Sequence, residues 1–423
     1  MNVWLLHVGE ELPVDETPRL FRYGHLANAL ADRGHQVLRW APTFQHFRKR
    51  QRWNHDHRVD VNDRYAIEFI HSPGYIRNAS LARWKSYSIL GRRLAERLQH
   101  ESPPDLIVTG IPSLEWCTVA VDYAERHNVP VVLDVRDLWP DIYLHLLPRS
   151  LQPLGELALT PLRRQLRSAC QRATAIYGVS QSYLDWGLKH AGRAQTSNDR
   201  VVPLGYHRRQ LEPSEHDAQL ADLAAHGIRG DKLLCVFAGL IERMYDVETI
   251  VRAARLLEQR SPGKFQFVIC GAGSKLPAVR RAAADLDSVK LLGWVTQPTI
   301  LALLEMASVG LATYTAGAPQ SLPNKPFEYM SAGLPIVTSL PGELPSLLGE
   351  HRCGVHYDAG DAESLATAIG FVVDDPKYHA EMGERSRQLF LERFNSPVVY
   401  TDFCDSLERV AGVPTQPQLG AAA

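Results

Sequence analysis

Short apolar runs alternate with amphipathic segments along almost the whole chain, and this alternation restricts the fold more than any other feature of the sequence. Residues 3–8 form an apolar run that is typical of a buried strand. Residues 19–33 carry apolar side chains three or four positions apart, which predicts a helix, and residues 36–40 form a second apolar run. A strand, a helix and a strand in this order make a parallel pair with a crossover helix. The expected fold class is therefore α/β.

The alternation continues in two series. In the first, further strands are expected at 66–70, 105–109, 130–134 and 175–179, with helices at 80–99, 114–127 and 162–173. A polar stretch at 206–231 resembles a linker, and strands are then expected at 232–238, 265–270, 289–292, 309–313, 335–339 and 354–357. A chain of 423 residues is too long for one ordinary core. We predict two doubly wound domains, 1–205 and 206–395, with a final helix at 396–412 that packs back on the first.

Charge and cysteine content narrow the function classes. The formal net charge is −1, so no general attraction to nucleic acid is expected. Residues 1–205 hold 26 Lys and Arg against 21 Asp and Glu, which indicates either an anionic partner or an ordinary solvated surface. The six cysteines include no Cys-x-x-Cys pair and indicate buried thiols in a reducing compartment. No apolar run is long enough to cross a membrane, so we expect a cytoplasmic protein with only peripheral membrane contact.

The strongest local signal lies in residues 321–336, Ser-Leu-Pro-Asn-Lys-Pro-Phe-Glu-Tyr-Met-Ser-Ala-Gly-Leu-Pro-Ile. A proline-rich loop runs into a short helix with Lys325 at its start and Glu328 in its first turn. Helix N-termini attract phosphate because their N–H groups lack partners, and Lys325 adds a positive charge. A carboxylate such as Glu328 can accept hydrogen bonds from the two hydroxyls of a ribose. A plain capped helix fits the same residues, because Glu is common in first turns.

This segment resembles the signature of the retaining glycosyltransferases of family 4, in which a Glu-x7-Glu motif precedes a Met-Ala-x-Gly-x-Pro stretch. Glu328 matches the second glutamate, which binds the donor ribose in that family, and Gln320 stands where the first glutamate is expected. The resemblance implies that Gln320 faces the transferred sugar as an uncharged hydrogen-bonding group. It also places Leu322, Asn324 and Lys325 in the donor site. The family has the GT-B fold, in which two Rossmann-like parallel-sheet domains face a central cleft.

A second match covers residues 236–250, Val-Phe-Ala-Gly-Leu-Ile-Glu-Arg-Met-Tyr-Asp-Val-Glu-Thr-Ile. Members of the family carry a basic pair here that binds the donor diphosphate. The positions of that pair map to Leu240 and Tyr245, so Arg243 is the candidate replacement and Lys325 the second cation. The resemblance places Tyr245 in the donor site. A solvent-exposed loop arginine is an equally simple interpretation of Arg243.

Two further segments match landmarks of the donor domain. Gly271 and Gly273 follow a predicted strand, where such glycines make a tight turn or, more often, permit close packing. Gly293, Trp294 and Val295 match a loop that presents backbone groups to the nucleobase in the family. Trp294 also fits a half-buried core position.

The first half of the chain supplies candidates for the sugar side of the site. Glu16 matches the stretch after the first strand, although the Gly-Gly pair usual in the family is missing. Arg136 and Asp137 match a run found in polysaccharide-assembly members and are expected near the transferred sugar; a buried Arg–Asp pair that orders a loop is the alternative. Basic clusters at 48–52, 92–93 and 163–167, with aromatic residues near the first, fit either an anionic lipid headgroup or a solvated face.

The resemblance implies transfer of a hexosyl group, with retention, from a UDP-sugar or GDP-sugar donor to a hydroxyl of a glycan or lipid-linked acceptor in surface polysaccharide synthesis. No cofactor is expected, and no Asp-x-Asp pair suits a required metal, so we predict metal independence. Two alternatives stay open. One is a sugar-nucleotide 2-epimerase of the same fold, and the other is a non-catalytic subunit that binds a nucleotide sugar.

Overall fold

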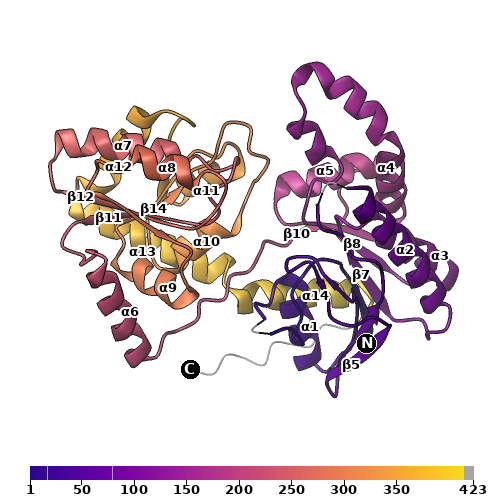
Figure 1. The fold of residues 1–423 in the computed structure, drawn as a ribbon. Helices are drawn as coiled ribbons and strands as arrows, with labels where there is room; N and C mark the ends of the chain where they lie inside the picture. Colours follow the sequence, from indigo (N-terminus) through magenta and orange to yellow (C-terminus); the bar gives the residue numbers. More distant parts are fainter. Residues whose placement is uncertain (17, 79, 414–423) are drawn as a thin grey trace. The chain divides into compact units, whose positions relative to one another are not determined.

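The computed structural model describes residues 1–16, 18–78 and 80–413. The chain divides into two compact units (Figure 1). Unit 1 comprises the described residues of Met1–Pro203 together with those from Val399 onward, and unit 2 comprises Leu204–Val398. The α/β class that the sequence predicts is confirmed, because both units are built on parallel sheets.

Unit 1 contains a sheet with the strand order β10-β9-β8-β7-β1-β2-β6-β5, in which only the β5–β6 pairing is antiparallel among the described pairings. Chain order reverses between β1 and β7, so the sheet has a switch point there. The strands are β1 (Asn2–Leu6), β2 (Gln36–Pro42), β5 (His57–Asn62), β6 (Tyr65–Ile70), β7 (Leu106–Gly110), β8 (Val131–Val135), β9 (Ala175–Gly178) and β10 (Arg200–Val201), and a small hairpin adds β3 (Phe44–Gln45) and β4 (Arg50–Gln51). The edge strand β5 was not predicted, because it lacks an apolar run and its residues alternate between half-buried and exposed.

Helices cover both faces of the unit 1 sheet. One face packs against α2 (Leu81–Leu98), α3 (Leu114–His127), α4 (Gln152–Arg172) and α5 (Gln181–Ala191). The other packs against α1 (Arg22–Asp32) and α14 (Ser396–Val410), whose Phe403 and Leu407 are fully buried. Two short 3-10 turns, Asp141–Leu146 and Arg149–Leu151, precede α4. The expected helix at 162–173 is too short: α4 extends back to Gln152, through Pro153, Gly155 and Pro161, which are residues that disfavour helix.

Polar contacts fix α14 to α1 and the turn after it. Arg33 donates 2.6 Å and 3.1 Å hydrogen bonds to the carboxylates of Asp405 and Glu408. The ring Nε2 of His35 lies 2.9 Å from the same Glu408 carboxylate. The last described helix of the chain is thus part of the core and the ion-pair framework of unit 1.

Unit 2 contains a parallel sheet with the order β13-β12-β11-β14-β15-β16, which is the 3-2-1-4-5-6 arrangement of dinucleotide-binding folds. Its strands are β11 (Leu233–Ala238), β12 (Phe265–Cys270), β13 (Val289–Gly293), β14 (Val309–Ala312), β15 (Ile336–Thr338) and β16 (Gly354–His356). Helices α6 (Pro213–Ala225), α9 (Gln297–Met306), α10 (Asn324–Ser331), α11 (Glu343–Glu350) and α13 (Pro376–Arg393) contribute to the core on one face, and α7 (Val247–Arg260), α8 (Leu276–Ala282) and α12 (Ala362–Val373) to the core on the other. Strand order reverses between β11 and β14, so the carboxyl ends of these two strands mark the place where ligands of such sheets bind.

The linker expected at 206–231 is wrong in part. Residues 213–225 form α6, which begins with Pro213 in its first turn and buries Leu223 against the unit 2 core. Only this one side chain of the helix is fully buried, so the apolar pattern was too weak to predict it.

Candidate functional site

The candidate donor site of unit 2 lies at the switch point between β11 and β14. The loop after β11 is bound to the segment after β14, since Thr315 donates its backbone N–H to the carbonyl oxygen of Met244 at 3.1 Å. Tyr245 also forms an isolated bridge with Tyr314. These contacts bring the sequence matches around Arg243 and Lys325 to one edge of one sheet.

Lys325 is buried at this edge. It is the second residue of α10, is only 8% exposed, and donates a 2.6 Å hydrogen bond from Nζ to the carbonyl oxygen of Ala238 at the end of β11. Its ammonium lies 4.6 Å from the ring centroid of Phe237 and 4.4 Å from that of Tyr245. Burial lowers the pKa of Lys325 to about 8, against the opposing effect of Glu328. A bound anion would offset this desolvation, because it favours the charged ammonium.

A glycine makes room for this ammonium. Gly239 follows β11 with a φ of +151°, and a Cβ added there would overlap Lys325 Nζ. Gly239 was not among the predicted site residues. The glycine that ends the strand in residues 236–250 was a usable signal, but its partner lies 86 positions later in the chain and no local pattern connects them.

The first turn of α10, which contains Lys325, has backbone N–H groups without a side-chain cap. Its N-cap is Pro323, whose side chain has no acceptor for the first N–H groups, and Asn324 is exposed. Glu328 is the fifth residue of the helix, so its expected place in the first turn is wrong, and it lies one turn further along on a half-buried position. Burial raises the pKa of Tyr314, and the charge of Glu328 adds to that effect, while at Lys325 it opposes the lowering by burial.

The other candidates around β11 and β14 have distinct surroundings. Tyr245 is half-buried, with its ring centroid 5.1 Å from that of Tyr314. Arg243 is exposed, and within the described parts of the chain its side chain makes no hydrogen bond or ion pair. Gln320 donates a weak 3.8 Å hydrogen bond from Nε2 to the Met244 sulfur, while its buried Oε1 has no partner among the described residues. Leu322 is half-buried against the unit 2 core.

Gly271 and Gly273 permit close packing of two loops. A Cβ on Gly271 would overlap the carbonyl oxygen of Gly239, and a Cβ on Gly273 would overlap the backbone of Ile241. The segment after β12 therefore lies directly against the loop that holds Lys325. This packing accounts for both glycines without a ligand.

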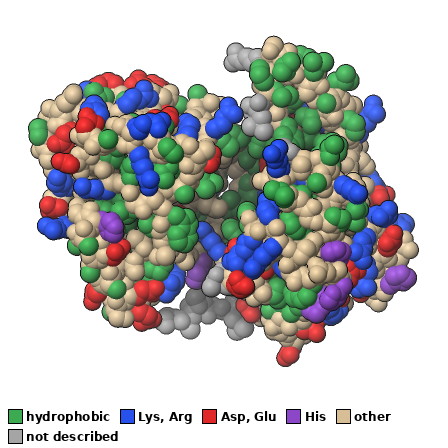
Figure 2. Space-filling model, viewed as in Figure 1, with side chains coloured by type: hydrophobic (Ala, Val, Ile, Leu, Met, Phe, Trp, Pro, Cys, Tyr) green, Lys and Arg blue, Asp and Glu red, His purple; other side chains and the backbone are tan. Residues whose placement is uncertain are grey.

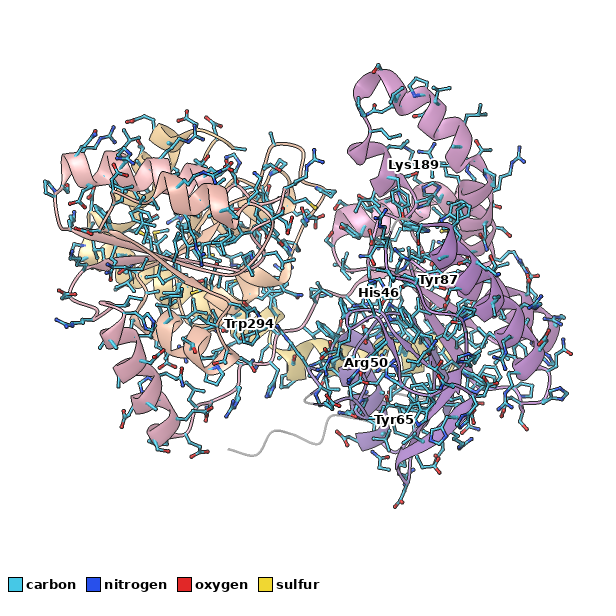
Figure 3. The ribbon with its side chains drawn as sticks, viewed as in Figure 1. His46, Arg50, Tyr65, Tyr87, Lys189 and Trp294 are labelled. Carbon is cyan, nitrogen blue, oxygen red and sulfur yellow. The ribbon has the colours of Figure 1, made fainter. Side chains whose placement is uncertain are left out.

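The loop after β13 is open. Gly293 has a φ of +70° and its carbonyl oxygen accepts a 2.6 Å hydrogen bond from Gly271. Trp294, labelled in Figure 3, is 76% exposed, so its interpretation as a half-buried core residue is wrong. Val295 is half-buried against the unit 2 core. An indole this exposed at the carboxyl edge of the sheet is available to a planar ligand.

In unit 1, Arg136 and Asp137 follow β8. The buried Arg136–Asp137 pair considered from the sequence is wrong, because Arg136 donates instead to the carboxylate of Glu10, which follows β1. Burial raises the pKa of Asp137. Glu10 also pairs with Arg39 of β2 at 2.9 Å. A nearby buried pair joins Arg22 to Asp134 at 2.9 Å. This network was not predicted, although an arginine inside a buried strand, such as Arg39, signals a buried partner.

Glu16 lies at an exposed position of the connection between β1 and α1. Its side chain is 75% exposed and 3.4 Å and 3.3 Å from Arg48 and Arg50. Arg52 of the same basic cluster is buried in a 2.6 Å pair with Asp15. The cluster at 48–52 is therefore partly neutralised and is not a free cationic patch. Arg93 and Arg163 of the other two clusters are also paired, with Asp56 and Asp141.

No group of three or more His, Cys, Asp and Glu side chains in the described ranges is placed to hold a metal ion. No described helix combines the length and the apolar composition that crossing a bilayer requires.

Each of the two units matches the model of a protein family. The family model described as Glycosyltransferase Family 4 matches residues 23–208. The model described as Glycosyl transferases group 1 matches residues 219–389. The two matches together cover most of the chain.

Curated relatives match over about half of their length or less. The amylovoran biosynthesis glycosyltransferase AmsK of Erwinia amylovora is 28% identical over 210 residues, which is 48% of this chain and 50% of AmsK. A D-inositol 3-phosphate glycosyltransferase of Pseudarthrobacter chlorophenolicus is 30% identical over 164 residues, 37% of this chain and 38% of that enzyme. A GDP-mannose-dependent phosphatidylinositol monomannoside mannosyltransferase of Mycolicibacterium smegmatis is 25% identical over 200 residues, which is 46% of this chain and 52% of that enzyme.

Solved structures share the fold along nearly the whole chain. HepE from Anabaena, solved with UDP, has a TM-score of 0.67 at 15% identity, with 97% of this chain and 100% of HepE covered. The sucrose-phosphate synthase of Thermosynechococcus elongatus has a TM-score of 0.72 at 17% identity, with 97% and 99% covered. The two family models show that the chain belongs to glycosyltransferase family 4, and the likeness to these solved structures shows that it has the GT-B fold.

Proposed function

We propose that the protein transfers a hexosyl group from a nucleoside diphosphate sugar to an acceptor hydroxyl, with retention at the anomeric carbon. The buried ammonium of Lys325 carries this proposal. It lies at the switch point of a dinucleotide-type sheet, beside the uncapped start of α10, and the only acceptor that the described residues give it is Ala238 O. A buried cation next to free helix N–H groups suits a diphosphate.

Each part of the donor has a proposed partner in unit 2. Lys325 and the first turn of α10 bind the diphosphate, and Glu328 binds the ribose hydroxyls. Gly293, Trp294 and Val295 line the base, where the exposed indole offers a stacking surface. Arg243, exposed on the loop that β11 leads into, is the proposed second cation.

In the proposed reaction, the bond between the anomeric carbon and the leaving phosphate oxygen breaks. The acceptor oxygen bonds to the same face of that carbon, and the hydroxyl proton goes to the departing diphosphate. Negative charge grows on the leaving group, and Lys325 with the α10 N–H groups stabilises it. Gln320, Arg136, Asp137 and Glu16 are the proposed residues of the sugar side. The Lys325 charge supports a reaction without a metal ion.

The proposed acceptor is a glycan or a lipid-linked sugar at the cytoplasmic face of a membrane. The large apolar side chains that unit 1 exposes, as far as the structure describes it, lie in the connections leaving the carboxyl ends of β2, β6 and β8. These are Phe47, Ile76, Leu81, Trp84, Leu151, Leu154 and Leu157. Figure 2 shows hydrophobic side chains over the end of α4 (upper right).

Cations accompany these apolar side chains. Arg77, Lys85, Arg164 and Arg167 are exposed in the same connections and helices. Apolar side chains flanked by cations suit the interface of an anionic membrane. The six cysteines are free and buried, which suits a reducing compartment.

The test is incubation of the full chain with a panel of UDP- and GDP-sugars, with and without a lipid-linked acceptor, in the presence and absence of a chelator. We expect release of nucleoside diphosphate that depends on acceptor and not on metal, and a product with the anomeric configuration of the donor, measured by NMR. An inverted product would contradict retention. Conversion of the free donor to its 2-epimer would favour the epimerase, and binding without turnover would favour the non-catalytic subunit.

A further inference from the structure

A buried carboxylate in unit 1 holds two guanidinium groups. Glu10 follows β1 and accepts hydrogen bonds from Arg39 Nη2 at 2.9 Å, from Arg136 Nη1, and from the backbone N–H of Tyr23 at 3.1 Å. Burial works to raise the pKa of Glu10, but Arg136, His7 and Arg39 outweigh it and lower the pKa to about 2. The carboxylate is therefore charged at neutral pH, with both oxygens in use.

His7 supports Arg136 from a second side. Its Nε2 lies 3.2 Å from Arg136 Nη1, and burial, with Arg136, lowers the pKa of His7 to about 3. The neutral ring accepts from Arg136 through Nε2, which assigns its hydrogen to Nδ1. The ring stacks on Tyr23 with centroids 4.6 Å apart. Gly110 makes room for this stack, since a Cβ there would lie 2.7 Å from the Tyr23 hydroxyl.

The guanidinium of Arg136 is thus fixed through one nitrogen and available through the others. Nη1 contacts Glu10 and His7, while Nε and Nη2 have no hydrogen-bond partner among the residues that the structure describes. The guanidinium carbon also lies 5.5 Å from the ring centroid of Tyr23. The side chain is 18% exposed at the carboxyl end of β8, whereas Arg39 beside it is fully buried. A guanidinium in this state offers parallel N–H groups that match the geometry of phosphate and carboxylate oxygens.

The surroundings favour an anion over a neutral ligand. Arg22, Arg39 and Arg136 are held by two carboxylates, Glu10 and Asp134. Burial raises the pKa of the adjacent carboxyl, Asp137, which forms no ion pair with Arg136 among the described residues. The three arginines thus outnumber the two carboxylates that hold them, and Arg136 is the one whose side chain reaches solvent.

We propose that Arg136 binds an anionic oxygen group, a phosphate or a carboxylate, and that Glu10 is the positioning residue that orients it. The proposal goes beyond the transfer reaction, because anion binding at Arg136 is measurable without turnover. The group belongs either to the acceptor or to the donor diphosphate.

The test is titration of the full chain with inorganic phosphate, alone and with saturating UDP, following the shift of the thermal unfolding midpoint. We expect Arg136→Met to abolish tight binding of phosphate. Glu10→Gln should weaken the phosphate affinity about tenfold, as for loss of a charge-assisted hydrogen bond. Asp199→Asn is the matched control, since Asp199 is also buried, pairs with Arg193 and accepts a backbone N–H, but from the amino end of β9. We expect it to leave phosphate affinity unchanged.

These measurements distinguish an acceptor anion from the donor diphosphate, and a wrong proposal from a variant that does not fold. Phosphate that binds together with UDP indicates an acceptor anion, and phosphate that UDP displaces indicates the donor diphosphate. Arg136→Lys leaves the Glu10–Arg39 pair in place and keeps the charge but loses the planar fork, so we expect intermediate affinity even if Glu10→Gln does not fold. Phosphate affinity that is the same in Arg136→Met as in the unchanged protein would overturn the proposal. An equal loss of phosphate affinity in Glu10→Gln and in Asp199→Asn would show that Glu10 has only a structural role.

Discussion

The Nζ of Lys325 donates a 2.6 Å hydrogen bond to the carbonyl oxygen of Ala238 and occupies the space where a side chain of residue 239 would lie. The positions of the lysine on α10 and the glycine after β11 therefore depend on each other. Because residue 239 has no side chain, the ammonium of Lys325 can reach the end of β11. This pairing places a buried cation close to Leu240 and Tyr245, the positions where the sequence resemblance leads us to expect a basic pair.

Replacing Gly239 by alanine should displace the ammonium. We expect donor affinity, measured by calorimetric titration with UDP, to fall roughly 10- to 100-fold, or about 1.4–2.8 kcal/mol. Strain at a φ of +151° adds a stability loss of about 1–3 kcal/mol. Gly360→Ala is the control, because Gly360 also has a positive φ but an added Cβ would meet no described atom within 4 Å. A Gly239→Ala protein with unchanged UDP affinity would refute the coupling.

The low pKa of Lys325 gives donor binding a pH dependence. Only the protonated ammonium attracts the diphosphate, and in the free protein it loses its proton as the pH rises through about 8. We expect UDP affinity to be constant below that pH and to fall about tenfold per unit above it, until the pKa of the bound state is reached. Lys325→Met should lower the affinity and abolish this slope. Arg243→Met is expected to keep the slope, and a flat profile in the unchanged protein would contradict the assignment.

Glu328 is expected to recognise the ribose. Glu328→Ala should weaken UDP about 10- to 100-fold, because charge-assisted hydrogen bonds to two hydroxyls are lost. The same variant should bind 2′,3′-dideoxy-UDP as well as the unchanged protein does, since that ligand lacks the hydroxyls. Glu350→Ala, at an exposed position of α11, serves as the control. An equal loss for both nucleotides would remove the ribose assignment.

The exposed leucines of α4 predict membrane binding that depends on them. Leu154 and Leu157 are 66% and 72% exposed. We expect Leu154→Ser combined with Leu157→Ser to reduce sedimentation with vesicles of anionic lipid roughly tenfold or more, because two apolar side chains no longer leave water. Phe371→Ser removes a comparably exposed apolar side chain from unit 2 and should have no effect. Equal binding to purely zwitterionic vesicles would contradict the role of the cations.

The sequence predicts the parallel-sheet class and most strands of both units, because buried parallel strands are continuous apolar runs bounded by turns. It predicts poorly where burial is partial. Helix α6 buries one side chain fully, and the first half of α4 exposes its leucines, so neither has the apolar face that marks a helix. Both elements needed the three-dimensional context.

For the candidate site, the sequence predicts candidate residues but not the side chains and backbone groups that contact them. Lys325 and Glu328 were predicted, yet the depth of Lys325 depends on a glycine 86 positions earlier. Arg136 was predicted, but its partner Glu10 is 126 positions away and meets it only because β1 and β8 lie in one sheet. Such pairings depend on strand order, which no local pattern encodes.

The helix that completes unit 1 is the last described helix of the chain. Phe403 and Leu407 of α14 fill the same core as α1, and Arg33 and His35 hold its Glu408. During synthesis, unit 1 leaves the ribosome first yet cannot close its core until all of unit 2 has been made. The nascent protein must therefore carry an open apolar face while the second half is translated, and a chain that stops early leaves that face exposed to proteases and chaperones.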